Sequence, residues 1–458
     1  SRWLPGDYLD PGPLSFESNF EIDSQNAPLG NFSMILGNND LSGEAHLQGI
    51  DLSEFPDLSV NPGKKIRITG ELKSSRLNTI EILPSRKSLQ RNRQSQEAIF
   101  SSDPFPLDWF QNLDLDISLK ANELVTRGFE AEEFNGKIKV ADRVLDVSAA
   151  SGEFSGGNFE MDIVVDTRAA PYAIDFKFEV AGLVLEQVPA LQHVDLPVQG
   201  AVDVNIDLVG NGISPKEIVS HSSGSIRISG TQAKMTSNSE RDFLTGSIIF
   251  EFLDLITQKE KTQVHSLDCG FIGFRVVDGI AMSQDTVVLQ TPDVTYLISG
   301  GFSLKDESVA FMINPKARKG LGVSAANLAN FRRIGGSLRN PKPETDPEGL
   351  VRTGVKWGLA AFTSGLSILG EGINNKFIGN KNVCQAAEDN QLQLLEESPE
   401  CVAHAWQRLT SATPLISPSI GNLLISSRIT STADLSAAIL SFLPIYLYEE
   451  IAASDVTF

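Results

Sequence analysis

Residues 113–120 read Leu113-Asp114-Leu115-Asp116-Ile117-Ser118-Leu119-Lys120, so apolar and polar side chains alternate along the chain. The same alternation returns in two later stretches, Ile174-Asp175-Phe176-Lys177-Phe178-Glu179-Val180 and Val202-Asp203-Val204-Asn205-Ile206-Asp207-Leu208. Successive side chains of a β-strand point to opposite faces of the sheet, so each stretch predicts a strand with one apolar and one polar face. A sheet of such strands has a continuous apolar face, and what covers that face decides the function.

Strand patterns occupy most of the chain. Residues 14–83 read as short strands separated by Gly and Asn turns, and strands return from Leu107 to about Leu338 with glycines at their joints. These units recur at a spacing close to the roughly 8–12 residues that are typical of all-β proteins. The sequence therefore predicts a mainly β fold.

A break in the strand pattern divides the chain. Residues 85–96 are basic and polar and lack apolar periodicity, which is typical of a linker. We expect a first β module over residues 1–84, a basic linker or loop over 85–106 and the main β module over 107–342.

Helical patterns are few. Asp346-Pro347-Glu348 has the capping Asp, the Pro at the first helical position and the acid that are typical of a helix start. A second amphipathic stretch runs from Cys384 to Glu397, so residues 343–398 are predicted to be a C-terminal helical segment. Apolar residues also recur at helical spacing over residues 242–258. The tail over residues 399–458 is rich in Ser, Ala and Leu and has no assigned structure.

The composition excludes some partners. The chain has 458 residues with Asp+Glu 58 against Lys+Arg 38, a formal net charge of −20. Nucleic acid and anionic membrane surfaces attract clustered Lys and Arg, so we expect neither to bind this chain by charge. Phe is abundant, with 25 residues against 4 Trp and 5 Tyr. A Phe side chain suits a protein interior or an acyl-chain contact equally well.

The sequence carries no recognisable pattern for catalysis. The five histidines lie far apart, and neither a GxSxG nucleophile motif nor a P-loop occurs. Cys269, Cys384 and Cys401 do not have zinc-ligand spacing. In an oxidising compartment two of them could pair, and in a reducing one all three would be thiols. We therefore predict no enzyme activity, catalytic residue, metal or cofactor.

The alternating pattern alone leaves two ways of covering the apolar face. Two sheets can bury their apolar faces against each other as a closed sandwich, which is the commoner solution. A single curled sheet can instead hold a ligand along its apolar face.

Short motifs along the chain, in this order, resemble the C-terminal region of the bacterial AsmA-like family. They are Asp103-Pro104-Phe105-Pro106-Leu107, residues 113–121, residues 152–160, Asn211-Gly212-Ile213-Ser214-Pro215, residues 223–228, residues 267–271, residues 277–280 and Gly336-Ser337-Leu338-Arg339-Asn340-Pro341, followed by Cys384. Residues 36–43 and 68–77 resemble the preceding repeat of the family. The likeness covers roughly residues 14–395 and favours the open, curled sheet over the sandwich.

The resemblance implies a fold, a place and a function. TamB-like and bridge-like lipid transfer proteins are related to this family and share a long curled sheet, the repeating β-groove, whose concave face is apolar. The chain is then expected to lie in the periplasm, tethered to the inner membrane by an N-terminal helix that is missing from this fragment. The implied function is non-enzymatic binding and transfer of phospholipids in the Gram-negative envelope, contributing to outer-membrane biogenesis. Its partners would be phospholipids and the inner and outer membranes, or envelope proteins, at the groove ends. The alternative is a periplasmic scaffold or assembly factor for outer-membrane proteins with a closed β-sandwich core.

The resemblance implies that the apolar faces of the alternating strands form a lipid-binding site. The expected groove-lining residues are Leu113, Leu115, Ile117, Leu119, Ile174, Phe176, Phe178, Val202, Val204 and Ile206. Their polar neighbours Asp114, Asp116, Lys177 and Asp203 are expected to face solvent. The family often carries cysteine at the positions of Cys269 and Cys384, which implies a disulfide that ties the helical segment to the sheet. The helix from Asp346 would cap the end of the groove or pack as core.

Overall fold

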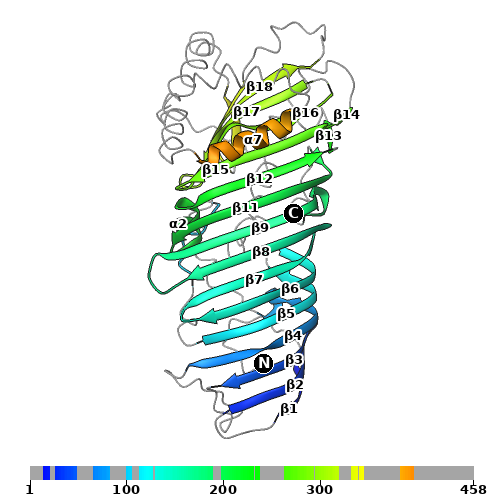
Figure 1. Ribbon diagram of the computed structural model, residues 1–458, viewed down its shortest axis with the longest axis vertical. Helices are drawn as coiled ribbons and strands as arrows, with labels where there is room; N and C mark the ends of the chain where they lie inside the picture. The colour runs from blue at the N-terminus through cyan, green and yellow to red at the C-terminus, as the bar shows by residue number, and fades with distance from the viewer. Residues whose placement is uncertain are drawn as a thin grey trace, which may run out of the picture.

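The computed structural model describes residues 14–20, 26–48, 65–82, 99–105, 113–126, 129–188, 198–231, 233–237, 263–292, 294–318, 332–338, 340–344 and 382–396. Its main feature is one elongated, curved sheet of seventeen strands (Figure 1). The strands are β1 (Leu14–Phe20), β2 (Asn26–Leu36), β3 (Asn39–Gln48), β4 (Ile66–Asn78), β5 (Leu113–Thr126), β6 (Phe129–Ala141), β7 (Val144–Phe154), β8 (Gly157–Asp166), β9 (Tyr172–Val184), β11 (Ala201–Gly212), β12 (Ser223–Thr231), β15 (Cys269–Val277), β16 (Ile280–Gln290), β17 (Val294–Ser303), β18 (Ser308–Ala317), β19 (Arg332–Ser337) and β20 (Asn340–Glu344).

The strands pair in the order in which they occur along the chain. All neighbouring pairs are antiparallel except β4 and β5, which are parallel. A parallel pair requires a long crossover connection, and residues 83–112 provide it. Because β4 pairs directly with β5, the sheet continues across the expected boundary between the modules. The division of the chain into modules stays a prediction.

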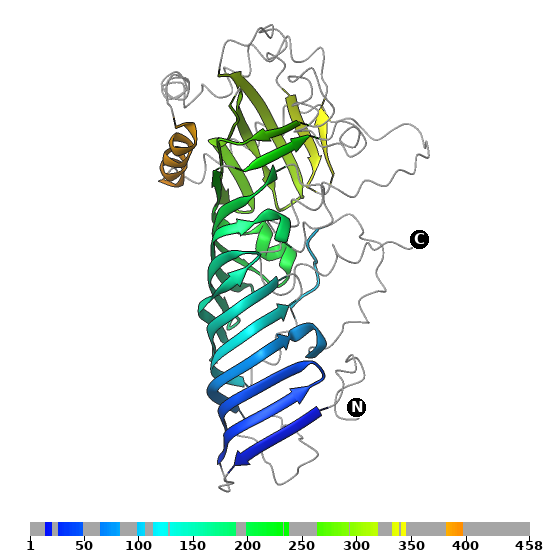
Figure 2. The same cartoon turned by 90° about the vertical axis from the view of Figure 1, so that its right-hand side faces the viewer.

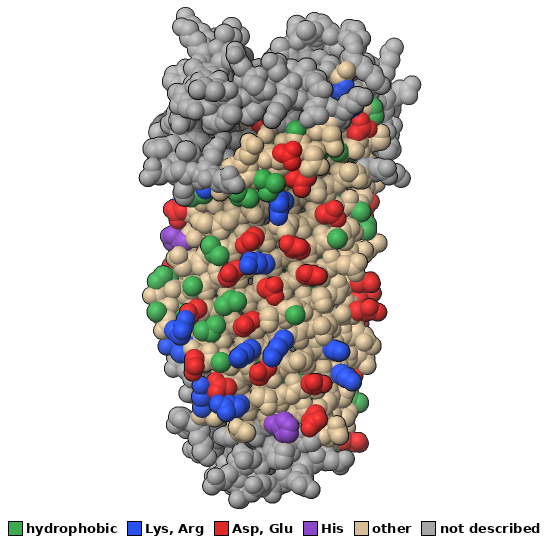
Figure 3. Space-filling view, in the orientation of Figure 1, with side chains coloured by type: hydrophobic (Ala, Val, Ile, Leu, Met, Phe, Trp, Pro, Cys, Tyr) green, Lys and Arg blue, Asp and Glu red, His purple; other side chains and the backbone are tan. Residues whose placement is uncertain are grey.

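The cross-strand register sorts side chains onto two faces. One face, the inner face, carries apolar side chains that lie opposite one another on six consecutive strands, namely Ile117, Ile138, Val147, Ile163, Phe176 and Leu208. The outer face carries Asp116, Lys139, Asp146, Val164 and Asp175 in the neighbouring row. Figure 3 shows side chains of both charges interspersed over this outer face. The alternation in sequence thus becomes one apolar and one charged side of a single sheet.

A small second sheet extends the main one at its side. Its strands are β10 (Val198–Gln199), β13 (Lys234–Ser237) and β14 (Gln263–Ser266). β12 continues into β13, and β14 continues into β15, each after a short break. The Leu267 N–H donates to the Ala233 carbonyl at 2.7 Å and bridges this break.

The described helices differ in length, and the longest of them, α7, lies on the outer face of the sheet. They are α1 (Thr79–Ile82), the 3₁₀ turn η4 (Leu185–Gln187), α2 (Pro215–Ser220) and α7 (Val383–Glu396). α2 begins at Ser214, whose hydroxyl accepts the Glu217 N–H at 3.3 Å, and Pro215 occupies its first position. The predicted helical stretch from Cys384 to Glu397 is confirmed as α7.

α7 covers the outer face where that face is also apolar. Phe271, Val288 and Leu297 lie opposite one another on β15, β16 and β17 and are buried with Val383 and Ala387 of α7. A disulfide joins Cys269 of β15 to Cys384 of α7, the pairing that the family resemblance implies. α7 is therefore fixed to the sheet by a covalent bond and by apolar packing.

The fold class expected from the sequence is confirmed: the structure is mostly β, with a long and mostly antiparallel sheet and a C-terminal helix. The described strands form this one long sheet and a three-stranded one, rather than two large sheets packed face to face. The helices predicted from Asp346 and over residues 242–258, the basic run over 85–96 and the tail over 399–458 lie outside the described residues.

Candidate functional site

The inner face of the sheet is the candidate site. All ten predicted lining residues lie on it: four on β5, three on β9 and three on β11. Buried among them are Leu119, Phe176, Phe178, Val202, Val204 and Ile206, whereas Leu113, Leu115, Ile117 and Ile174 are partly buried. The structure brings the ten together on one face, and their contact with lipid stays a prediction.

Aromatic side chains that the alternation did not single out form the centre of this face. Phe129 stacks on Phe154 with ring centroids 4.9 Å apart and meets the edge of Phe159 at 5.2 Å. Phe178 lies 6.1 Å from Phe159 and 6.4 Å from Phe176 between ring centroids. The aromatic cluster therefore joins β6, β7, β8 and β9 on the inner side.

Bulges explain why the sequence pattern did not place Phe154 on this face. The registers of β6 with β7 and of β7 with β8 shift, and Glu133 and Ala149 have positive φ angles of 51° and 50°. Each bulge inserts a residue and reverses the alternation beyond it. A usable signal was the pair of phenylalanines, Phe154 and Phe159, that flank the Gly156-Gly157 turn.

The polar neighbours of the predicted lining residues lie on the outer face, as the alternation requires. Lys177 and Asp203 are exposed, and the Asp203 carboxylate accepts the Gly182 N–H at 2.8 Å. Asp114 is half-buried between Lys65, with N–O at 2.7 Å, and Arg67, at 3.3 Å. Burial alone would raise the pKa of Asp114, but hydrogen bonds and charge from Lys65 and Arg67 outweigh it and lower that pKa.

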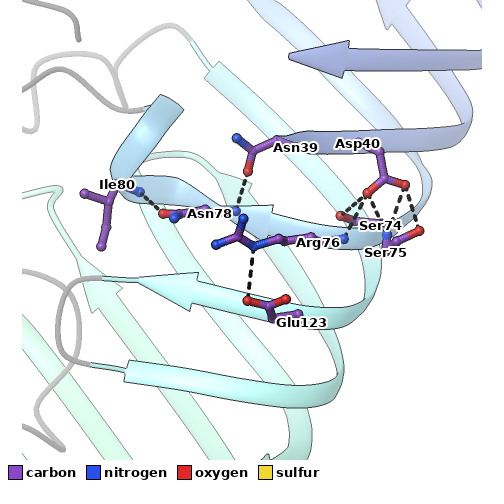
Figure 4. Close-up of polar contacts among 8 residues, drawn as sticks. All are labelled: Asn39, Asp40, Ser74, Ser75, Arg76, Asn78, Ile80 and Glu123. Carbon is purple, nitrogen blue, oxygen red and sulfur yellow. Dashed lines mark hydrogen bonds and ion pairs between the residues drawn. The ribbon is translucent and has the colours of Figure 1, made fainter. Parts of the chain in front are cut away.

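A polar cluster joins the start of β3 to the end of β4 (Figure 4). The Asp40 carboxylate accepts the backbone N–H of Ser75 at 2.9 Å and of Arg76 at 2.9 Å, and the Ser75 hydroxyl at 3.1 Å. Burial acts to raise the pKa of Asp40, and the hydrogen bonds from Arg76 and Ser75 outweigh it, so the pKa lies below its ordinary value. The carboxylate thus holds β4 beside the start of β3, just beyond the last residue pair of their ladder, Ser42 with Lys73.

Two observations bear on other kinds of site. Among the described residues, no three His, Cys, Asp or Glu side chains gather where they could hold a metal ion. Within the same part of the chain, every helix is too short or too polar to span a bilayer.

Comparison with known proteins gives one match. Residues 72–237, from β4 to β13, match the family model described as the AsmA family. Neither the curated proteins nor the solved structures that were compared with the chain gave a match. Membership of this family is consistent with lipid transport or assembly at the cell envelope, and the family is generally non-enzymatic. The match over residues 72–237 supports the assignment of the chain to an AsmA-like family.

Proposed function

We propose that the protein binds phospholipids by their acyl chains along the inner face of the sheet and transfers them in the Gram-negative envelope. One observation carries the proposal: an unbroken apolar row crosses six consecutive strands from Ile117 to Leu208. A second apolar row lies two residues away along each of five strands. It joins Leu115, Val140, Leu145, Val165 and Ile174. Such rows give an acyl chain continuous apolar contact from β5 to β11.

The free energy of acyl-chain exposure explains why such a surface is useful. Each CH₂ group that leaves a membrane for water costs about 0.8 kcal/mol, so spontaneous transfer of a phospholipid is very slow. A sheet that is apolar on one side and charged on the other shelters the chains while its outer face stays hydrated. The protein itself needs no chemistry for this role, and direction would come from lipid gradients or partners.

The burial of the inner face sets a condition on binding. Phe176 and Phe178 are each 1% exposed, so acyl chains could reach them only after the face opens. The proposal therefore includes a displacement of the groups that now cover the apolar face.

We place the protein in the periplasm and propose that it contributes there to outer-membrane biogenesis. The Cys269–Cys384 disulfide supports an oxidising compartment. The two ends of the sheet, at β1 and β20, are where membranes or envelope proteins would dock.

The test is mass spectrometry of organic extracts from the purified protein and matched variants. Ile117→Glu and Phe176→Glu place a charge on the inner face, and Lys177→Glu places the same side chain on the outer face of the same strand as Phe176. We expect phospholipid to co-purify with the wild type and Lys177→Glu and to be lost from Ile117→Glu, with circular dichroism showing an intact fold. Ile117 is only partly buried, so this variant should fold even if Phe176→Glu does not.

Extracts free of phospholipid from the wild type would count against the proposal. Equal phospholipid in the wild type and folded Ile117→Glu would show that the inner face does not hold it. Either result would favour the alternative role of a periplasmic scaffold for outer-membrane proteins.

A further inference from the structure

Residues 99–105, which we name the cover segment, lie on the inner side of the sheet within the crossover from β4 to β5. Figure 2 shows this blue segment on the side of the sheet opposite α7. Ile99 is 3% exposed, Phe100 is 1% exposed, and both belong to the apolar cluster that contains Phe176 and Leu208. The remaining residues, 101–105, are partly or fully exposed. Among the described residues, the cover segment thus places Ile99 and Phe100 against the apolar face and leaves residues 101–105 at least partly exposed to solvent.

One carboxylate fastens the start of the cover segment. Glu307, in the turn between β17 and β18, accepts the Ile99 N–H at 2.7 Å and the Phe100 N–H at 3.4 Å. The carboxylate also forms an ion pair with Lys216 of α2, with N–O at 2.6 Å. The Glu307 side chain is itself buried, so these hydrogen bonds compensate for its loss of water.

Two backbone hydrogen bonds hold the rest of the cover segment beside α2. The Ser101 carbonyl accepts the Lys216 N–H at 2.9 Å, and the Phe105 N–H donates to the Ile213 carbonyl at 3.0 Å. These polar contacts of the cover segment are therefore made with α2, with Ile213 just before it and with the turn between β17 and β18.

The fastening is separate from the architecture of the sheet. β4 pairs with β5 along its length without help from the cover segment, and none of residues 99–105 belongs to a strand. Glu307 has a positive φ of 55°, which is unfavourable for a side-chain-bearing residue. Positive φ angles also occur in other hairpin turns of the sheet, at Ser155 and Asp278, so this conformation belongs to the turn and not to the cover segment. The cover segment can therefore leave the inner face while the strand ladder stays intact.

We propose that residues 99–105 are a displaceable cover of the inner face, and that an acyl chain takes the place of Ile99 and Phe100 when the cover segment leaves Glu307. This inference rests on the proposed function and identifies where loading is controlled. The side chains of Ile99 and Phe100 offer the same apolar contact that an acyl chain would, so the two compete for one surface.

A reversible lock tests the proposal. Ser101 and Lys216 share a backbone hydrogen bond of 2.9 Å, so they are the pair at which an engineered disulfide is placed. The double variant Ser101→Cys/Lys216→Cys is made in a Cys401→Ser background. Oxidation ties the cover segment to α2 by a disulfide, and reduction opens that disulfide. The ion pair between Lys216 and Glu307 is absent from both forms. The Cys401→Ser protein alone, treated in the same way, controls for reduction of the Cys269–Cys384 bond.

Binding of lipid is measured with vesicles of phosphatidylethanolamine and phosphatidylglycerol that carry a fluorescent phosphatidylethanolamine. We expect about tenfold more probe on the reduced than on the oxidised double variant, because the lock depletes the open state, and no such change in the control. In parallel, Glu307→Gln should accelerate hydrogen exchange at the Ile99 and Phe100 amides and leave β9 protected. That measurement does not require the engineered disulfide to form.

The outcomes separate the two proposals. Equal probe binding by the locked and unlocked forms would overturn the displaceable cover and leave the lipid-binding role standing. If no form binds the probe, the proposed function fails, and an apolar dye then tests the cover alone. Dye fluorescence that rises on reduction of the double variant supports a displaceable cover, and unchanged fluorescence overturns it.

Discussion

Asp40 shows how a single carboxylate can organise a strand junction. We expect Asp40→Asn to lower the free energy of unfolding at pH 7 by about 1 kcal/mol, the scale of hydrogen bonds to a charged group that is partly screened by water. The pKa of Asp40 lies below its ordinary value of 3.8, so its contribution is complete above that value. The contribution is lost as the pH falls through the lowered pKa, because the protonated acid accepts these bonds less well.

Urea denaturation at pH 7 and at pH 2 to 3 measures this effect. The difference between the wild type and Asp40→Asn should shrink at the acidic pH. Asp116→Asn is the matched control, since Asp116 makes a surface ion pair with the side chain of Lys137. A loss for Asp116→Asn as large as that for Asp40→Asn would show that general surface charge, rather than the backbone contacts, is responsible.

At this scale the sequence predicted the facing of individual side chains wherever strands are regular. Ile117, Phe176 and Ile206 alternate without interruption, so their common face followed from the period of two. The face on which Phe154 lies was not predicted, because the bulge at Ala149 shifts the register of its strand. Bulges depend on partner strands, which a single sequence does not reveal.

α7 is the element whose attachment can be tested most directly. The Cys269–Cys384 bond closes a loop with a sequence separation of 115 residues, which in the chain-entropy model corresponds to about 4–5 kcal/mol of stabilisation. We expect Cys384→Ser to lower the free energy of unfolding by up to about this amount. Amide exchange in α7 should rise more than exchange in β9.

Thiol titration of the denatured protein checks the pairing itself. The chain has three cysteines, so one free thiol is expected before reduction and three after it. Cys401→Ser is the control and should have no free thiol before reduction. Three thiols in unreduced wild-type protein from an oxidising compartment would contradict the disulfide.

The position of α7 could be predicted from the sequence, and its docking surface could not. Asn382 caps the helix by accepting the Gln385 N–H at 3.3 Å, and the apolar spacing beyond it is local information. The buried Gln391 donates to the carbonyls of Ile226 and Phe274 at 3.2 and 3.3 Å, two residues that are remote in sequence. Such contacts exist only once β12 and β15 are neighbours.

On the scale of the whole molecule, the kinds of element could be predicted, but which strands pair with which could not. The alternation of apolar and polar residues predicts which side chains share a face, but it does not predict which strands pair. The parallel pair of β4 and β5, with Ile117 beside Gly70, has no signature in either strand. The consequence is large, because residues 99–105 of the connection between the two strands, including Phe100, lie over the inner face.

The open sheet also has two ends, and β20 is built to resist further pairing. Its described partner is β19 alone, and it carries Pro341 and Pro343. In an antiparallel pair, alternate N–H groups point toward the partner, and proline is tolerated where the N–H would point away. The free side of β20 therefore lacks the donors that an added strand needs.

Replacing both prolines should convert this end into a site of self-association. We expect Pro341→Thr/Pro343→Thr to form dimers or larger species in sedimentation velocity over a concentration series, whereas the wild type shows less association. Lys342→Thr is the matched control, because the N–H of residue 342 points toward β19 and the substitution adds no donor to the free side. If the double variant and the control sediment alike, proline is not what protects the end of the sheet. If only the double variant associates, the chain limits growth of its own sheet at β20 by withholding two backbone donors.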